Sequence, residues 1–260
     1  MGEAAEAIPS IQILEAKVHM IQMPEVMGLM DHWIGVEHDR LHHVVNTGMH
    51  GIMEGHKNPD IIAILNSADI LAPDGILAIL IARVHGYRIK KQETGPDLLW
   101  RFSEIGHRKS YRYFFFGDTA ETLGRLSGKI SAEFPNVKIV GYNSPPFRQL
   151  TPEEDAAIVA EINEAGPDVL WVGLGMPRQE QWISEHRESL KVPVVVGAGA
   201  SFKFIAGTVS RAPSLVCTLG FEWLWRLAQE PKRVWRRVLI DAPRFLGLVG
   251  LQLIGLKKFG

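Results

Sequence analysis

Short, continuously apolar segments alternate with longer helical patterns in the second half of this sequence. The apolar segments are residues 111–116, 137–141, 169–172 and 194–196, and the helical patterns between them are 121–134, 151–165 and 179–190. Strands that are apolar at nearly every position must be covered on both faces, as in parallel β-α-β units. We therefore predict an α/β, Rossmann-like fold, with a mainly parallel sheet and helices on both of its faces.

The boundaries of several elements are also readable. Thr151, Pro152 and Glu154 are typical of a helix start with an N-cap, a proline in the first turn and a capping box. The first third is less regular, with strands expected at 17–22 and 42–46 and helices at 24–34, 58–67 and 74–84. Beyond Pro213 the pattern is helical, with breaks expected near Pro231 and Pro243. We expect a catalytic domain at 1–213 and a helical appendage at 214–260.

The composition restricts the class of protein. The chain has 260 residues with 46% hydrophobic side chains, which is enough for a large core. It contains no run of roughly 18 to 20 apolar residues and does not begin like a signal peptide. Its single cysteine, Cys217, fits a reducing cytoplasm, and its net charge of −1 argues against a nucleic-acid partner. We expect a globular cytoplasmic protein.

Basic and aromatic residues are concentrated near the C-terminus. Between residues 226 and 258, eight Lys and Arg residues stand against two acidic ones, and Trp223, Trp225 and Trp235 lie in or just before this stretch. Arg226, Arg233 and Arg237 would share one helical face if the break at Pro231 is gentle. Such clusters suit a diphosphate or an anionic lipid surface. The segment 244–256 fits an interfacial amphipathic helix or a core helix equally well.

Three glycine-containing turns are expected along one rim of the sheet, because ligands of such folds bind at the carboxyl ends of the strands. The turns are Gly117-Asp118, residues 173–179 and residues 197–202. The last two begin as G-x-G after a strand but do not complete the dinucleotide fingerprint. Their glycines let backbone N–H groups approach a phosphate or a sugar, although tight turns would need the same residues.

Two aspartates are candidates for acid-base chemistry. Asp74 follows an apolar run and Pro73 and precedes Gly75, so it is either a general base held in a cleft or the N-cap of a helix. The same two interpretations apply to Asp97, where the cap is favoured. No metal is expected, because the ten histidines lack ligand spacing and no D-x-D follows a strand. A G-x-S-x-G elbow is also absent from the sequence.

Six short motifs, taken together, resemble the WecG/TagA/CpsF family of bacterial glycosyltransferases over roughly residues 17 to 245. They are Pro73-Asp74-Gly75, residues 94–99, 173–180 and 197–207, Arg211-Ala212-Pro213, and the stretch from Glu222 to Arg237. The resemblance implies transfer of a sugar from a UDP-sugar donor to an undecaprenyl-diphosphate-linked monosaccharide. It further implies inversion, no metal and no other cofactor, and a peripheral position at the inner face of the cell membrane.

The resemblance also assigns roles to residues. Asp74 matches the family's proposed base, and Gln179 matches a sugar or nucleotide contact. Arg226, Arg233 and Arg236 match arginines thought to close over the diphosphate. We expect the remaining substrate contacts from these residues: Gly75, Thr94, Asp97, Gly117, Gly173, Gly175, Gly197 and Gly199.

Two places depart from the family pattern. Asn46-Thr47-Gly48 stands where T-x-N is common, so Asn46, Thr47 or His50 are expected to take over acceptor contacts. Lys203 stands where the family often has an acid between two phenylalanines, which would suit a negatively charged or differently hydroxylated donor.

Two other functional classes remain open at this point. One is a nucleotide-dependent oxidoreductase, which the incomplete glycine fingerprints and the lack of a Tyr-x-x-x-Lys pair disfavour. The other is a non-catalytic membrane adaptor that uses only the C-terminal segment, which would leave Asp74 and Gln179 unexplained.

Overall fold

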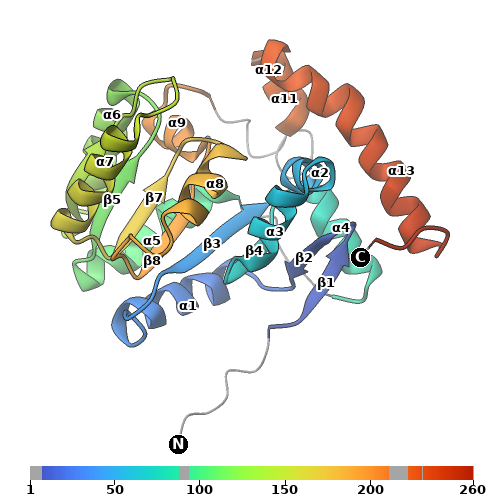
Figure 1. Cartoon of the computed structure of the whole chain (residues 1–260), viewed down its shortest axis with the longest axis horizontal. Coiled ribbons are helices and arrows are strands. Elements are labelled where there is room, and N and C mark those ends of the chain that lie inside the picture. Colours follow the sequence, from blue (N-terminus) through green and yellow to red (C-terminus); the bar gives the residue numbers. More distant parts are fainter. Residues whose placement is uncertain (1–7, 88–93, 211–221, 230, 260) are drawn as a thin grey trace, which may run out of the picture.

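A parallel sheet forms the centre of the molecule. The computed structural model describes residues 8–87, 94–210, 222–229 and 231–259. Within them, six strands pair in parallel in the order β4-β3-β8-β7-β5-β6 (Figure 1). Their bounds are β3 His42–Thr47, β4 Ile70–Pro73, β5 Arg112–Phe116, β6 Lys138–Asn143, β7 Val169–Val172 and β8 Val194–Gly197.

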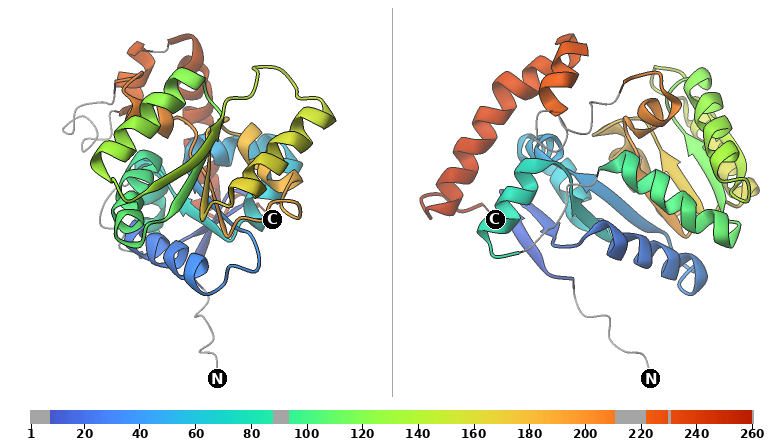
Figure 2. Two further views of the ribbon diagram at one scale, coloured as in Figure 1. Left: turned by 90° about the vertical axis from the view of Figure 1, so that its left-hand side faces the viewer. Right: turned by 180° about the vertical axis from the view of Figure 1, so that it is seen from behind.

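Alternate strand residues enter cores on opposite faces of this sheet, as the period of two requires. Phe115 and Trp171 pack with helices on one face, and Phe114 and Leu170 pack with helices on the other. The first face is covered by α1 (Met23–Gly35), α5 (Gly95–Lys109), α6 (Ala120–Glu133) and α9 (Ser201–Ala206). The second is covered by α3 (Pro59–Ser67), α7 (Pro152–Ala165) and α8 (Arg178–Glu185), and Figure 2 shows the two helical layers. The predicted fold class is confirmed.

Side-chain caps set the starts of several of these helices, among them α7 and α5. Thr151 Oγ1 accepts a hydrogen bond from the Glu154 N–H at 3.2 Å, and Glu154 Oε2 accepts one from the Thr151 N–H at 2.9 Å. The predicted capping box is therefore present, and losing such a cap costs about 1 kcal/mol. The helix α5 has the same kind of start at Thr94 and Asp97, close to the helix cap that was favoured for Asp97, although the extent of this helix was not predicted.

The first third contains elements that the sequence did not reveal. In place of one strand at 17–22, β1 (Ser10–Ile13) and β2 (Ala16–His19) form an antiparallel hairpin. The helix α2 (Met49–Lys57) and the strand β4 were not expected either, since α2 is rich in glycine and histidine and β4 has only four residues. The helix α4 (Ile76–Val84) begins two residues later than expected.

The C-terminal segment is helical, as expected, in the part that the structure describes. It consists of α11 (Glu222–Gln229), α12 (Pro231–Arg236), the π-helical segment η1 (Arg237–Asp241) and α13 (Ala242–Leu253). The expected irregularity near Pro243 takes the form of η1 directly before α13. The expected domain boundary at 213/214 and the Arg211-Ala212-Pro213 motif lie outside the described residues.

The helix α13 has a buried face, as the core-helix interpretation requires, whereas its role as an interfacial helix stays a prediction. Phe245 and Val249 are buried in the core that also includes the β1–β2 hairpin, α2 and α4. Lys57 Nζ lies 2.8 Å from Asp241 Oδ1, and the Gln252 side chain bonds to the backbone of β1 and the following turn. The outward side of the same helix exposes Leu246, Leu251 and Leu253. One face of α13 is therefore a core face, and the other presents apolar side chains to solvent.

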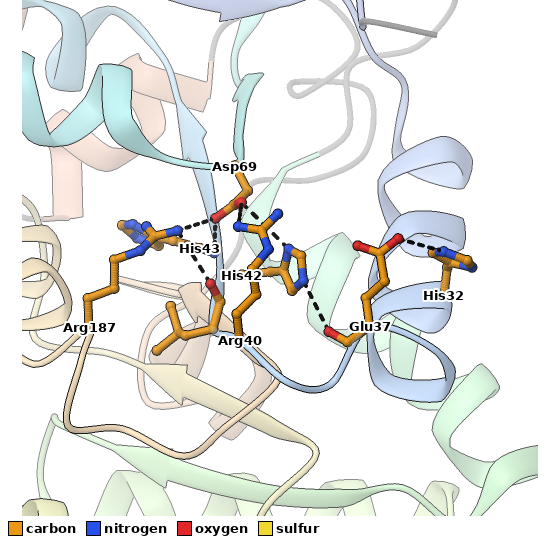
Figure 3. Close-up of polar contacts among 8 residues, drawn as sticks. His32, Glu37, Arg40, His42, His43, Asp69 and Arg187 are labelled. Carbon is orange, nitrogen blue, oxygen red and sulfur yellow. Dashed lines mark hydrogen bonds and ion pairs between the residues drawn. The ribbon is translucent and has the colours of Figure 1, made fainter. Parts of the chain in front are cut away.

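A polar cluster stabilises the edge of the sheet where β3 and β4 begin (Figure 3). Asp69 accepts hydrogen bonds from the His43 N–H at 2.9 Å, from Arg187 Nη2 at 2.8 Å and from Arg40 Nη1 at 2.9 Å. Burial acts to raise the pKa of Asp69, but these donors outweigh it and lower the pKa overall. Burial also lowers the pKa of the fully enclosed His43 ring to about 4. This cluster ties β3 to β4 and to the segment after α8.

Candidate active site

Asp74 lies at the carboxyl end of β4, against the end of β3. Thr47 pairs with Pro73, and the Asp74 N–H donates to the Thr47 carbonyl oxygen at 2.6 Å. A side chain at Gly48 would collide with the Asp74 carbonyl oxygen, so only glycine permits this approach. The N-cap of α4 is Gly75, with φ of +82°, so Asp74 lies one residue before the N-cap position that the alternative assigned to it. Asn46, Thr47, Asp74 and Gly75 thus gather at one place on the rim.

Tight glycine contacts form the rim at β5 and β7. Gly117 has φ of +111°, and a Cβ there would lie 2.7 Å from the Gly173 carbonyl carbon. The Gly173 N–H donates to the Phe116 carbonyl oxygen at 2.7 Å, and a Cβ on Gly173 would collide with the Phe202 ring. These glycines are required by packing, which satisfies the tight-turn interpretation, and Gly173 also lines the cavity described below.

Gln179 joins the two loops that follow β7 and β8. Its side-chain oxygen accepts hydrogen bonds from the backbone N–H groups of Gly175, at 3.1 Å, and Gly199, at 3.0 Å. Its amide nitrogen donates to Glu180 Oε1 at 2.8 Å, and only 4% of the residue is exposed. The structure therefore places Gln179 between the loops. A direct contact with a sugar or nucleotide stays a prediction.

A cavity of about 80 Å³ opens at the carboxyl ends of the strands from β5 to β8. Its polar side chains are Asp118, Arg178 and Lys203, and Lys203 Nζ lies 3.9 Å from Asp118 Oδ2. The rest of the lining comes from Gly173, Leu174, Gly175, Gly199, Ala200 and residues 145–147. The cavity combines backbone from two glycine loops with two cationic side chains, which suits an anionic ligand that also carries hydroxyl groups.

The cavity and Asp74 belong to one continuous rim. A side chain on Gly51 of α2 would collide with both Thr47 Oγ1 and the Met176 side chain, so the loop after β7 reaches the end of β3. Because neighbouring strands lie about 4.8 Å apart, two to three strand spacings place Asp74 roughly 10 to 15 Å from the cavity. An extended nucleoside-diphosphate sugar has a comparable length.

The start of α5 also reaches this rim. A Cβ on Gly95 would lie 2.8 Å from Ser201 Oγ, at the first residue of α9. Asp97 Oδ2 accepts hydrogen bonds from the Thr94 N–H, at 3.0 Å, and from the Thr94 hydroxyl, at 2.9 Å. Asp97 therefore caps the helix from its third position rather than as the N-cap itself. Whether either residue contacts substrate stays a prediction.

The C-terminal arginines differ in how far the structure describes them. The backbones of Arg226 and Arg233 are helical, but their side chains lie outside the description. Arg236 is exposed, with its guanidinium carbon 5.7 Å from the centre of the Trp235 ring.

Sequence reasoning missed Arg178, which lines the cavity. Its position directly after Gly-Leu-Gly-Met-Pro was the available signal.

One cluster among the described residues has the composition of a metal site. Ligand atoms of His50, Glu54 and Asp241 lie within 4.8 Å of one another. Lys57 Nζ, however, is 2.8 Å from Asp241 and 3.3 Å from Glu54, so its ammonium group already pairs with both carboxylates. Sequence spacing gave no signal for this cluster, because Asp241 comes from a distant segment.

In the part of the chain that the structure describes, no helix has the length and apolar character needed to cross a bilayer.

Comparison with known proteins agrees with this geometry. The chain matches the model of the glycosyl transferase WecG/TagA/CpsF family over residues 11–259. It is 33% identical over 183 residues to the N-acetylglucosaminyldiphosphoundecaprenol N-acetyl-beta-D-mannosaminyltransferase of Bacillus subtilis (strain 168), covering 70% of this chain and 69% of that protein. The protein of the same name from Bacillus spizizenii (strain ATCC 23059 / NRRL B-14472 / W23) is 31% identical over 196 residues, 75% and 74% of the two chains. The chain therefore belongs to the WecG/TagA/CpsF family and is a glycosyltransferase.

Proposed function

We propose that this enzyme moves a sugar from a UDP-sugar to a monosaccharide linked to a polyprenyl diphosphate, with inversion and without a metal ion. The names of the two Bacillus relatives specify an undecaprenyl-diphosphate-linked N-acetylglucosamine acceptor and transfer of N-acetylmannosamine. They support a lipid-linked acceptor for this chain as well. Membership of a glycosyltransferase family leaves the oxidoreductase alternative without support.

The single observation that carries the proposal is the placement of Asp74 and the cavity on one rim of the sheet. Asp74 lies at the end of β4, and the cavity with Arg178 and Lys203 lies beyond the end of β8. A UDP group in the cavity would extend its diphosphate toward β3 and β4. The donor sugar would then lie beside Asp74, where the acceptor hydroxyl must also enter.

The proposed reaction is a single displacement. Asp74 takes the proton of the acceptor hydroxyl as its oxygen bonds to the anomeric carbon, and the bond from that carbon to UDP breaks. Attack from the side opposite the leaving group inverts the anomeric centre. Arginines from the C-terminal helices, together with Arg178 and Lys203, would neutralise the departing diphosphate. Each such group contributes about 2 to 4 kcal/mol to lowering the barrier in a site closed to water.

A peripheral position on the inner leaflet of the cell membrane is part of the proposal. The C-terminal helices and the residues after α13 expose large apolar side chains together with basic ones, and α13 lies along one side of the molecule (Figure 1). The apolar residues are Leu224, Trp235, Leu239, Ile240, Leu246, Leu251, Leu253, Ile254 and Leu256, and the basic ones are Lys232, Arg236, Arg244, Lys257 and Lys258. Such a surface suits the interface of an anionic bilayer.

The test is product formation from a panel of UDP-sugars with acceptors linked to a lipid diphosphate. Mass spectrometry should detect a lipid-linked disaccharide, and NMR of the product should show the anomeric configuration opposite to that of the donor. Retention of configuration would exclude the single displacement. A chain that binds liposomes but does not bind UDP in calorimetry would favour the adaptor alternative and contradict the proposal.

A further inference from the structure

Glu180 is a buried acid that the proposed mechanism does not use. The residue has no exposed surface, and its Oε2 has no hydrogen-bond partner among the described residues. Its other oxygen, Oε1, accepts the hydrogen bond from Gln179 Nε2. A carboxyl group that is enclosed in this way is costly, so a local structural purpose is expected for it.

The neighbouring amide explains that purpose. Gln179 must present its oxygen to the N–H groups of Gly175 and Gly199, because an amide turned by 180° would place its NH₂ group against two other donors. Glu180 Oε1 accepts a hydrogen bond and therefore favours the orientation in which the Gln179 nitrogen faces it. The acid thus selects one of two amide orientations that have nearly the same shape.

Gly197 shows how closely this pair fits between the loops. A Cβ at this last residue of β8 would lie 2.6 Å from Gln179 Nε2 and 2.9 Å from Glu180 Oε1. The two side chains therefore press against the backbone where β8 ends. They join the loop that carries Gly175 to the loop that carries Gly199, and both loops line the cavity.

We propose that Glu180 is a positioning residue for the donor cavity. It fixes the amide orientation of Gln179, and Gln179 in turn fixes the separation of the loops at Gly175 and Gly199. Gln179 acts on the donor through these loops and not by direct contact. The effect on donor binding rests on the proposed function, whereas the effect on the two loops does not.

The chain offers a reciprocal exchange as the test. In the double variant Gln179→Glu with Glu180→Gln, the new carboxylate accepts from both glycine N–H groups, and the new amide donates to that carboxylate. All three hydrogen bonds are retained. Gln179→Leu and Glu180→Leu each remove part of the network, and Glu185→Gln, on the exposed end of α8, is the matched control.

Two measurements give the result. UDP affinity by calorimetry should fall at least about tenfold in each leucine variant, as the loss of a buried hydrogen bond implies. The exchanged pair and the control should stay within about threefold of the wild type. Hydrogen exchange of the Gly175 and Gly199 amides should accelerate in the leucine variants and return to the wild-type rate in the exchanged pair.

An exchanged pair as impaired as Gln179→Leu in UDP affinity, with wild-type exchange at both glycines, would overturn the proposal, since the amide itself would then contact the donor. Wild-type affinity and exchange in Glu180→Leu would overturn it too. If Glu180→Leu does not fold, the UDP affinity and the glycine hydrogen exchange of Gln179→Leu and of the exchanged pair still test the proposal. A wild-type chain that binds no UDP but shows the expected exchange pattern would contradict the proposed function alone.

Discussion

The backbone N–H of Asp74 donates a hydrogen bond to the carbonyl oxygen of Thr47 at 2.6 Å, which extends the pairing of β3 and β4 one residue beyond the last strand residue, Pro73. The residue proposed as the base is therefore held by the sheet. Its backbone also lies against Gly48, where no side chain can separate the two segments. A catalytic group on such a support needs little reorganisation when the acceptor binds.

Replacing Asp74 by Asn should nearly abolish transfer, because the amide keeps the shape but cannot take the proton. Removal of a general base costs about 100- to 10,000-fold in rate. UDP affinity and the melting temperature should be unchanged. A variant that keeps more than about a third of the wild-type kcat with a native melting profile would show that Asp74 is not the base.

Turnover should persist in EDTA, since the proposed mechanism neutralises the diphosphate with guanidinium and ammonium groups. Initial rates with and without the chelator are the measurement. A loss of activity that Mg²⁺ or Mn²⁺ restores would contradict this account, and the cluster of His50, Glu54 and Asp241 would then be the first place to look for the ion.

Glu180 should make the fold less stable as the pH rises. Burial raises the pKa of its carboxyl to about 7 in the folded chain, while the unfolded chain has an ordinary value. The folded state therefore holds more protons than the unfolded state between pH 4.5 and 7. About 2 kcal/mol is lost between pH 5 and 7. Denaturant unfolding of Glu180→Gln should show a gain in stability over the wild type that grows with pH. A difference independent of pH would contradict the assignment.

His43 should make the fold less stable as the pH falls, which is the reverse of the effect expected for Glu180. Burial lowers the pKa of its ring to about 4, so the unfolded chain takes up the proton first as the pH falls from 7 toward 4. This costs about 2 kcal/mol of stability between pH 7 and 5. His43→Leu removes the titrating ring, so its free energy of unfolding should fall less with acid than that of the wild type. Parallel curves for the two proteins would show that His43 does not carry the effect.

Mutations in the C-terminal segment should separate its catalytic function from its membrane function. Arg233→Ala and Arg236→Ala should lower kcat even on a detergent-soluble acceptor. Exchanging the exposed Leu246, Ile254 and Leu256 for serine should weaken liposome binding without loss of folding, since the buried face with Val249 is untouched. Salt should reduce binding of the wild type only in part, because basic residues contribute about 1 kcal/mol each and the rest is apolar. Equal partitioning of the serine variant would contradict the membrane assignment.

The sequence revealed those parts of the fold that depend on local pattern. The strand at 169–172 is apolar at every position, and the helix after Thr151 carries its own cap, so both were predicted closely. The helix α2 was missed because Met49–Lys57 contains two glycines and two histidines. The cavity needed knowledge of packing, since Asp118 and Lys203 meet only through the order of the strands. The glycine loops were found, but the partners of Gln179 were not.

The bond from Gln12 Nε2 to the Phe259 carbonyl oxygen, at 2.6 Å, joins segments that are 247 positions apart in the chain. During synthesis the hairpin of β1 and β2 leaves the ribosome long before its partner, which consists of α13 and the residues after it. The core that contains Phe245 and Val249 can therefore close only after α13 has been translated. The six-stranded sheet can assemble before that time, so the C-terminal helices close over a framework that has already folded.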